Sequence, residues 1–248
     1  MIRQGRTRRR MSTMLVTALL MVTLLPATAS AGSDSTGADV MVAGTVDSVP
    51  RTAVLRGATV TAAPVLRPGM RGSRVRALQQ RLVALRYWLG EVDGVYGYLT
   101  TQAVMAFQKV NRLPRDGIAG PGTMSALKNP VKPRPRSSGN RVVEINKTTQ
   151  VVLLVRSGTV KKIFNASTGT ASTPTPSGSF RVYRQINGWR RSPLGLLYRP
   201  KYFSGGYALH GSTSVPAYPA SHGCVRVNLR SMDHLWPRVP IGTRVRIY

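Results

Sequence analysis

A proline- and arginine-rich stretch, residues 129–140 (NPVKPRPRSSGN), divides the chain into two parts with different hydrophobic patterns. In residues 67–128, apolar side chains recur three and four positions apart, which is the spacing of one helix face. In residues 141–248, short runs of apolar and β-branched residues are typical of strands. The prolines of the dividing stretch favour an extended spacer, and its basic residues repel one another. We therefore expect a linker between two units that can each fold alone.

The first part is expected to form a small three-helix bundle. The pair Gly72-Ser73 offers an N-cap for the first helix, and Thr100 or Thr101 offers one for the second. A third, short helix begins at Pro121, which suits an early helical position. The residues expected to face inward from the first two helices are Val75, Leu78, Leu82, Leu85, Val104 and Phe107.

The second part is expected to be mostly β, which makes the whole chain a multidomain α+β protein. Its predicted strands are short and separated by turn signals, an arrangement that favours a closed or sandwiched β-domain. One helix is expected near residues 229–236, with Asn228 or Ser231 as its cap, and His234 within it is interpreted as structural. The predicted strands cover residues 143–145, 151–155, 160–164, 180–183 and 245–247.

Residues 1–31 are typical of a secretory signal peptide: five arginines precede an apolar run that ends at an Ala-Ser-Ala cleavage site. Residues 32–66, rich in small and polar residues, are interpreted as a flexible tether. Export is therefore expected, with the route (Sec or twin-arginine) and the retention of the leader as an anchor left open. The formal net charge is +28, or +28 − 5 = +23 without the leader. Such a basic exported protein is expected to associate with anionic wall polymers or phospholipid surfaces.

The chain has a single cysteine, Cys224, and two of its three histidines, His210 and His222, are close to it in sequence. A thiol near an imidazole is a candidate nucleophile, because a base can generate the attacking thiolate. One alternative is a buried structural cysteine. Another is a zinc site formed by these three residues, but a catalytic zinc also requires a nearby carboxylate, and this segment has none. The two histidines compete for the role of base: His222 precedes Cys224 by two residues, which in an extended strand would put both side chains on one face.

The segment Ser221-His222-Gly223-Cys224, preceded by His210-Gly211, resembles the signature of YkuD-type L,D-transpeptidases. The resemblance covers residues 141–248 and implies a mostly β catalytic fold that requires no cofactor and no metal. By this resemblance Cys224 is the nucleophile and His210 the base, oriented through the carbonyl of Gly211.

The same resemblance implies the roles of the remaining site residues. His222 would hold the loop or help to bind the acyl group, and the N–H groups of Gly223 and Cys224 would stabilise the oxyanion. Arg226 is the expected contact for a stem-peptide carboxylate, since guanidinium pairs well with carboxylate. Ser221 and Ser212 complete the expected substrate contacts. Three aromatic residues, Trp189, Tyr202 and Phe203, could line the acyl cleft, but we expect them to fill the core.

Residues 67–128 resemble the peptidoglycan-binding type 1 domain, from Arg71-Gly72-Ser73-Arg74-Val75 through Asp93-Gly94-Val95-Tyr96-Gly97 to Asp116-Gly117-Ile118. This resemblance implies wall binding through a glycan-facing groove. The candidate glycan-binding residues are Asp93, Gly94, Tyr96, Gly97 and Thr100, although Asp-Gly pairs also form turns and Tyr96 could be a core residue.

Together the two resemblances imply an exported enzyme that forms 3→3 cross-links between peptidoglycan stems. Its expected partner is peptidoglycan, both stem peptides and glycan strands. No nucleic acid and no membrane span after cleavage of the leader are expected. The alternatives are a wall-binding protein without activity and a cysteine peptidase or carboxypeptidase that acts on the same polymer.

Overall fold

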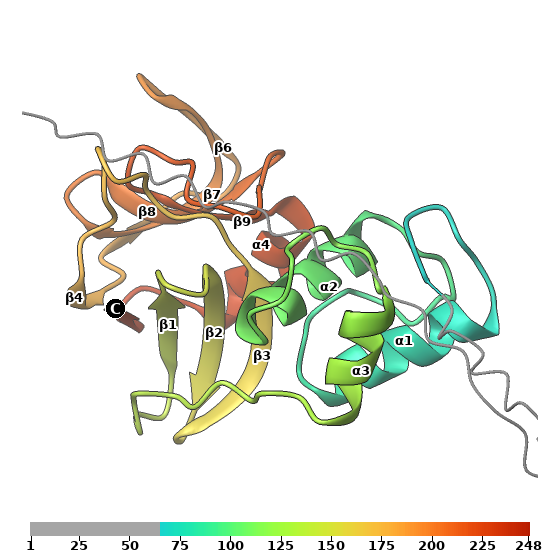
Figure 1. The fold of residues 1–248 in the computed structure, drawn as a ribbon. Coiled ribbons are helices and arrows are strands. Elements are labelled where there is room, and N and C mark those ends of the chain that lie inside the picture. Colours follow the sequence, from blue (N-terminus) through green and yellow to red (C-terminus); the bar gives the residue numbers. More distant parts are fainter. Residues whose placement is uncertain (1–64) are drawn as a thin grey trace, which may run out of the picture. The chain divides into compact units, whose positions relative to one another are not determined.

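The computed structural model describes residues 65–248, which belong to one compact unit of the chain (Figure 1). The predicted leader, residues 1–31, and all but the last two residues of the predicted tether, 32–66, lie outside the described residues. Of these last two, Leu66 is buried and pairs with Ala119 through two backbone hydrogen bonds. Among residues 65–248, no helix combines the length and apolar character that spanning a membrane would need.

Three helices form the first part: α1 (Ser73–Ala84), α2 (Tyr98–Val110) and α3 (Pro121–Lys128). The predicted inward-facing residues of α1 and α2 are in the core, except Leu85, which follows the end of α1 and is partly buried against it. The predicted pair Gly72-Ser73 does supply the N-cap of α1, whereas the prediction of Thr100 or Thr101 as the cap of α2 is wrong. The N-caps are glycines, Gly72 and Gly97, and neither helix has a side-chain cap.

Each of two turns in this helical bundle is held by one glutamine side chain that hydrogen-bonds to three acceptors. We call each such set of bonds a clasp. The sequence Asp-Gly-(Val/Ile)-x-Gly-x-x-Thr occurs at residues 93–100 and again at 116–123, each time running into a helix. In the first copy the Gln79 side-chain amide donates to Asp93 Oδ1 (2.7 Å), Val95 O (3.0 Å) and Thr100 Oγ1 (3.0 Å). In the second copy Gln108 makes the equivalent three bonds to Asp116, Ile118 and Thr123. The sequence analysis missed this internal repeat.

The second part is a two-sheet β-domain. One sheet has the order β3-β2-β1-β10-β4 and the other the order β5-β7-β8-β9, with β6 paired to β7. A hydrophobic core lies between the sheets, with Val143 and Ile145 from the first and Leu209 and Val225 from the second. The strands of the first sheet are β1 (Val142–Asn146), β2 (Val151–Arg156), β3 (Thr159–Asn165), β4 (Gly178–Arg181) and β10 (Arg244–Ile247). Those of the second are β5 (Arg184–Gln185), β6 (Trp189–Ser192), β7 (Gly195–Ser204), β8 (Tyr207–Ser212) and β9 (Val225–Asn228).

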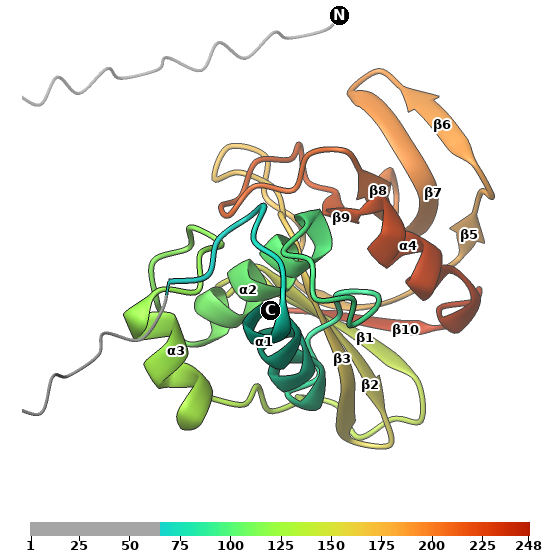
Figure 2. The ribbon, with the colours of Figure 1, turned by 90° about the vertical axis from the view of Figure 1, so that its right-hand side faces the viewer.

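One helix, α4 (Leu229–Leu235), follows β9 directly and continues into a 3-10 turn, η1 (Trp236–Arg238). The Asn228 side chain caps α4 by accepting a hydrogen bond from the Ser231 N–H at 2.8 Å, so the helix and one of its two suggested caps agree with the prediction. Helix α4 packs on β8, which carries His210, and on β9, which directly follows Cys224 (Figure 2).

The helical bundle and the β-domain share one hydrophobic core. Helix α2 packs on β3 and β2 (Figure 1), and alternate residues of β2 (Val151, Leu153 and Val155) join the core cluster of the bundle. The residues between them, Val152 and Leu154, belong to the core between the two sheets. The expectation of two units that can each fold alone is tested by the experiment below, because removing the bundle would expose one apolar face of the sheet.

Lys109 of α2 adds a buried polar contact to this interface. Its side chain is 1% exposed, and its ammonium donates to Asn165 Oδ1 (2.6 Å), Ala166 O (2.8 Å) and Gln150 O (3.3 Å). Burial, with a smaller contribution from nearby Arg115, lowers the pKa of Lys109 to about 7. The three acceptors satisfy all three donors of the charged amine, so helix α2 is fixed to the end of β3 in one orientation.

The linker also differs from the expected spacer, because it is bound along its length. Near its start, Val131 N–H donates to Asn111 Oδ1 at 2.8 Å. Further along, Arg136 N–H donates to the buried carboxylate of Glu144 at 3.0 Å. The linker therefore contacts the bundle at one end and the β-domain at the other.

The shared core predicts that the bundle and the β-domain unfold together. Phe107 of α2 is fully buried against Tyr87, and Phe107→Ala should cost about 3–5 kcal/mol of stability. We expect one thermal transition that moves to lower temperature as a whole, measured by near-ultraviolet circular dichroism and by hydrogen exchange of the β-strands. Two separate transitions, with strands β7–β9 unaffected by the substitution, would contradict the shared core.

Candidate active site

The parallel pairing of β8 with β9 brings the two halves of the candidate site together. In its register His210 lies opposite Arg226, and Leu209 lies opposite Val225. Cys224 immediately precedes β9, so it is one residue from this ladder and enters the same cleft as His210. Two segments that are 14 residues apart in sequence are thus held side by side by backbone hydrogen bonds.

The loop before Cys224 is fixed by short-range contacts. Ser221 Oγ accepts from Gly223 N–H at 3.1 Å and donates to Cys224 O. Gly223 has φ +106°, a conformation that favours glycine, and a Cβ there would lie 2.3 Å from the Tyr207 ring. Thr175 Oγ1 donates to Gly223 O at 2.8 Å, which ties the loop to the segment after β3. The backbone that presents the thiol is therefore held in one conformation.

His210 is oriented by its own strand. Its side chain is 4% exposed, and Nδ1 lies 2.9 Å from Gly211 O. Because a carbonyl oxygen only accepts, Nδ1 carries the hydrogen and Nε2 is left unprotonated. Burial lowers the pKa of His210 to about 4, and the positive charge of Arg226 acts in the same direction. His210 is therefore a neutral base at physiological pH.

Burial raises the pKa of the Cys224 thiol, and a backbone hydrogen bond at Ala208 and the charge of Arg226 only partly oppose this. The resting pair is consequently a thiol and a neutral imidazole rather than a thiolate and an imidazolium. Attack by such a thiol would require the imidazole to accept its proton, which is general-base catalysis of a nucleophile.

A cleft of about 860 Å³ opens over this pair. The predicted substrate contacts Arg226, Ser212 and Ser221 line it, and so does the exposed His222. Its opposite wall is the β6–β7 hairpin, with apolar residues such as Leu194 and Leu196 that the sequence analysis did not single out.

The three aromatic residues considered for this cleft divide between cleft and core. Phe203 is in the core, as expected, and Tyr202 is buried yet also lines the cleft. Trp189 is 50% exposed and lines the cleft, so the expectation that it fills the core is wrong. Its strand, β6, pairs only with β7, and this leaves one side of the hairpin open to solvent.

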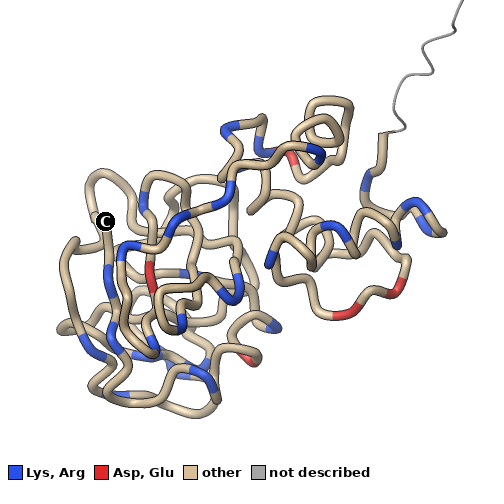
Figure 3. The backbone as a smooth tube through the Cα atoms, turned by 90° about the horizontal axis from the view of Figure 1, so that it is seen from below, with Lys and Arg blue, Asp and Glu red and all other residues tan. Residues whose placement is uncertain are grey.

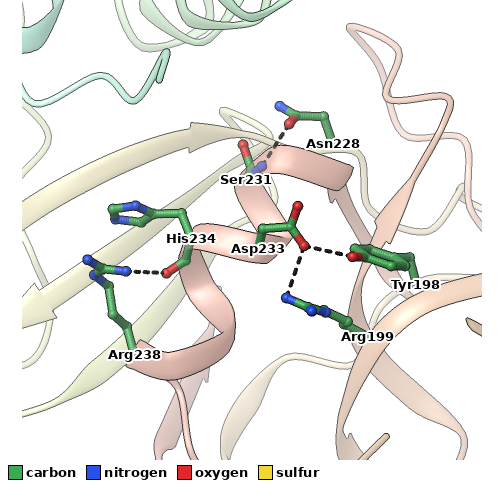
Figure 4. Close-up of polar contacts among 7 residues, drawn as sticks. All are labelled: Tyr198, Arg199, Asn228, Ser231, Asp233, His234 and Arg238. Atoms are coloured by element: carbon green, nitrogen blue, oxygen red, sulfur yellow. Dashed lines mark hydrogen bonds and ion pairs between the residues drawn. The ribbon is translucent and has the colours of Figure 1, made fainter. Parts of the chain in front are cut away.

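Helix α4 supports the strand that lies beside His210 (Figure 4). Asp233 accepts a hydrogen bond from Tyr198 OH at 2.8 Å and forms an ion pair with Arg199 at 3.1 Å. Tyr198 lies opposite Gly211, and a Cβ on Gly211 would come within 2.8 Å of the tyrosine ring. The sequence offered one indication that Asp233 anchors neighbouring residues: it is one of two acidic residues in residues 141–248.

Three of the five candidate glycan-binding residues, Gly94, Tyr96 and Thr100, are buried. Tyr96 is 1% exposed and donates its hydroxyl hydrogen to Gly117 O at 2.7 Å. Thr100 and Gly94 are buried in the Gln79 clasp. Asp93 and Gly97 line a separate, open groove of about 600 Å³, together with the exposed Tyr98, which had not been considered, and residues of α4.

Residues 65–248 contain no group of three or more His, Cys, Asp and Glu side chains placed to hold a metal ion. The zinc site formed by His210, His222 and Cys224, weighed from the sequence, is therefore not assembled in this part of the chain.

Comparison with known proteins gives two family matches. The model of the YkuD family, described as "L,D-transpeptidase catalytic domain", matches residues 140–247, and one described as "Putative peptidoglycan binding domain" matches residues 71–127. A solved L,D-transpeptidase structure from Xylanimonas cellulosilytica is 49% identical, with a TM-score of 0.72, over 75% of this chain and 98% of that one.

Curated relatives include the Bacillus subtilis protein named "Putative L,D-transpeptidase YqjB", which is 31% identical over 44% of this chain and 72% of its own length. The N-acetylmuramoyl-L-alanine amidase CwlL of Bacillus licheniformis is 42% identical over 31% of this chain. The match spans only 22% of that amidase, and 18% of a second amidase from the same species.

The neutral resting pair predicts the reactivity of Cys224. Alkylation of the full chain by iodoacetamide should show a rate that rises with pH to a midpoint above that of N-acetylcysteine, because only the thiolate reacts. Intact-protein mass spectrometry reports this one site, since the chain has no other cysteine. A rate that is already constant below neutral pH would instead indicate a preformed thiolate.

Proposed function

This chain belongs to the YkuD family of L,D-transpeptidases, and we propose that it is an exported cell-wall enzyme that forms 3→3 peptidoglycan cross-links. The observation that carries the proposal is the arrangement of Cys224 and His210 in one cleft, with the imidazole held as a neutral base by the carbonyl of Gly211. The leader-like residues 1–31 support export, and the family match over residues 71–127 supports attachment to the wall.

The first step transfers an acyl group to the enzyme. His210 Nε2 takes the thiol proton as Cys224 Sγ attacks the carbonyl carbon of the third residue of a tetrapeptide stem. The tetrahedral intermediate collapses when its C–N bond breaks. The leaving D-Ala amine takes the proton from His210, and a thioester remains on Cys224.

The second step resolves the thioester. An amine of a neighbouring stem attacks the thioester carbonyl and gives its proton to His210. The C–S bond breaks, the proton returns to Cys224, and the new amide is the 3→3 cross-link. Water or a D-amino acid in place of the amine would give carboxypeptidase or exchange activity at the same site.

We assign the oxyanion to the backbone N–H of Cys224. Gly223 N–H, which was expected to share this role, already donates to Ser221 Oγ at 3.1 Å. Gly223 instead gives the loop its left-handed turn and its close approach to Tyr207. Arg226, half-buried on the cleft wall, is assigned to a stem carboxylate, and Ser212 and His222 to the rest of the acyl donor.

We propose that the helical bundle holds the enzyme on peptidoglycan through the open groove that contains Asp93, Gly97 and Tyr98. Tyr98 is 52% exposed, so its ring is free to pack against a sugar. Gly94, Tyr96 and Thr100 would act indirectly, because their contacts shape the turn that carries these groups.

The proposal is tested with the full chain and a purified tetrapeptide muropeptide. We expect a thioester adduct on Cys224 and release of D-Ala by mass spectrometry, and neither with Cys224→Ala. His210→Ala should lower kcat about 10²–10⁴-fold, because the general base is lost. His222→Ala, a matched change of an exposed imidazole in the same cleft, should have a much smaller effect.

The products separate the alternatives. A cross-linked dimer identifies transfer, whereas a tripeptide alone identifies a carboxypeptidase. Cleavage of an internal stem bond without D-Ala release would identify a peptidase. No adduct and no product, with binding to sacculi intact, would favour a wall-binding protein without activity.

The low pKa of His210 predicts the acid limit of the reaction. Activity measured as kcat/KM should fall with an apparent pKa of about 4, rather than the ordinary histidine value of 6.5, because the protonated imidazole cannot accept the thiol proton. The unfolded chain binds more protons than the folded one between these two values, so stability also declines as the pH falls from 6.5 through 4. Circular dichroism at each pH must therefore show a folded protein. An acid limb near 6.5 in folded protein would contradict the neutral base.

A further inference from the structure

Arginines gather where the edge strand β4 pairs with β10, away from the cleft of Cys224. Arg181 of β4 lies directly opposite Arg244 of β10 in the antiparallel register. Arg246 is two residues further along β10, on the same face of the sheet as Arg244. Arg136 arrives from the linker, and its backbone carbonyl accepts a hydrogen bond from the Arg246 guanidinium at 2.9 Å. With Arg141, these four residues form what we call the arginine groove.

The described residues provide no carboxylate partner for these guanidinium groups. The one ion pair found in residues 65–248 joins Arg199 of β7, in the other sheet, to Asp233 of α4. Glu144 is close in the fold, but it is buried, and its Oε2 accepts from Arg136 N–H and from Tyr248 OH. Figure 3 shows how few acidic positions accompany the basic ones in this part of the chain. Like charges that face each other across a ladder are destabilising, so the Arg181–Arg244 pair needs an explanation beyond folding.

The groove is hollow and has hydroxyl groups in its walls. Two adjoining hollows, of about 480 and 380 Å³, share Arg181 and Arg244 in their linings. Thr243, 5% exposed, lines one of them, and Ser137 lines the other. The hydroxyl oxygens of both residues are buried and have no hydrogen-bond partner. Buried hydroxyls are normally paired, so two unpaired hydroxyls beside the same arginines are unusual.

We propose that the arginine groove binds a polymeric phosphodiester, with successive phosphates contacting Arg181, Arg244 and their neighbours. Guanidinium groups match phosphate oxygens with paired hydrogen bonds, and nearby hydroxyls add further donors. A polymer fits better than a single ion because the arginines form a row through two hollows, and one chain can contact several of them at once. A membrane surface offers the same phosphate chemistry, and the vesicle probe in the test below distinguishes it from the polymer.

This site is independent of the proposed transfer reaction. None of the five groove arginines lines the cleft of Cys224, and the groove contacts the linker rather than the β6–β7 hairpin. Binding can therefore be measured directly, with no substrate turnover, and its failure would leave the Cys224 chemistry untouched.

The test compares three probes that share one chemistry: glycerol 3-phosphate, poly(glycerol phosphate) and vesicles of phosphatidylglycerol. The full chain should bind the polymer with a strong salt dependence. Arg181→Gln with Arg244→Gln should weaken binding at least tenfold. This double variant should also show a shallower dependence of the binding constant on salt. The slope of log K against the logarithm of the salt concentration should shrink by about 0.7–0.9 for each lost phosphate contact. The control, Arg74→Gln with Lys161→Gln, removes the same charge from two exposed positions outside the groove and should change both quantities far less.

Thermal unfolding provides the second readout. Removing the facing arginines should leave the melting temperature unchanged or higher, because a repulsion is lost. The polymer should raise the melting temperature of the wild type more than that of the double variant. Equal weakening by the two double variants would reduce the effect to net charge and overturn the proposal. Tight binding of glycerol 3-phosphate alone, or groove-dependent binding of vesicles but not of the polymer, would overturn it as well.

Discussion

Burial of the first sheet on both faces is the constraint on which the rest of this structure depends. Along β2, Val151, Leu153 and Val155 face the helices, while Val152 and Leu154 face the second sheet. Neither cover can be removed without exposing apolar strand surface to water, and apolar burial is the main favourable contribution to folding. The helical bundle and the first sheet therefore share one hydrophobic core. Lys109 fixes its orientation through three buried hydrogen bonds.

The chemistry of the site follows from the same ordered framework. The ladder between β8 and β9 sets the place of His210 relative to Cys224, and close glycine contacts at Gly211 and Gly223 hold the surrounding backbone. Burial then acts in opposite directions on the two groups, because it disfavours the charged form of each: the pKa of His210 falls and that of Cys224 rises. Burial thus favours a neutral thiol and a neutral imidazole in the resting site.

Much of the fold and of the candidate site could be predicted because the signals are local. The helix at 229–235 and its cap Asn228 follow from neighbouring residues, and the Cys224 segment is a compact motif. Other features depend on distant residues and left no local signal. Trp189 resembles any core aromatic until its strand is known to project at the edge of the sheet. Thr100 suggested a helix cap, yet its hydroxyl pairs with Gln79, a residue 21 positions away.

By itself, the sequence determined the helices, the strands of the first sheet, the chemical groups available for catalysis and the excess of positive charge. These properties depend on side-chain identity and on periodicities of two or about 3.6 residues, which are fixed within short segments. Only the tertiary structure decided which segment covers each face of the helices and sheets. It placed the helices on β2, the hairpin over Cys224, and Arg181 opposite Arg244. Packing between distant segments sets these relations, because a strand's alternation defines two faces but not the partner that each one meets.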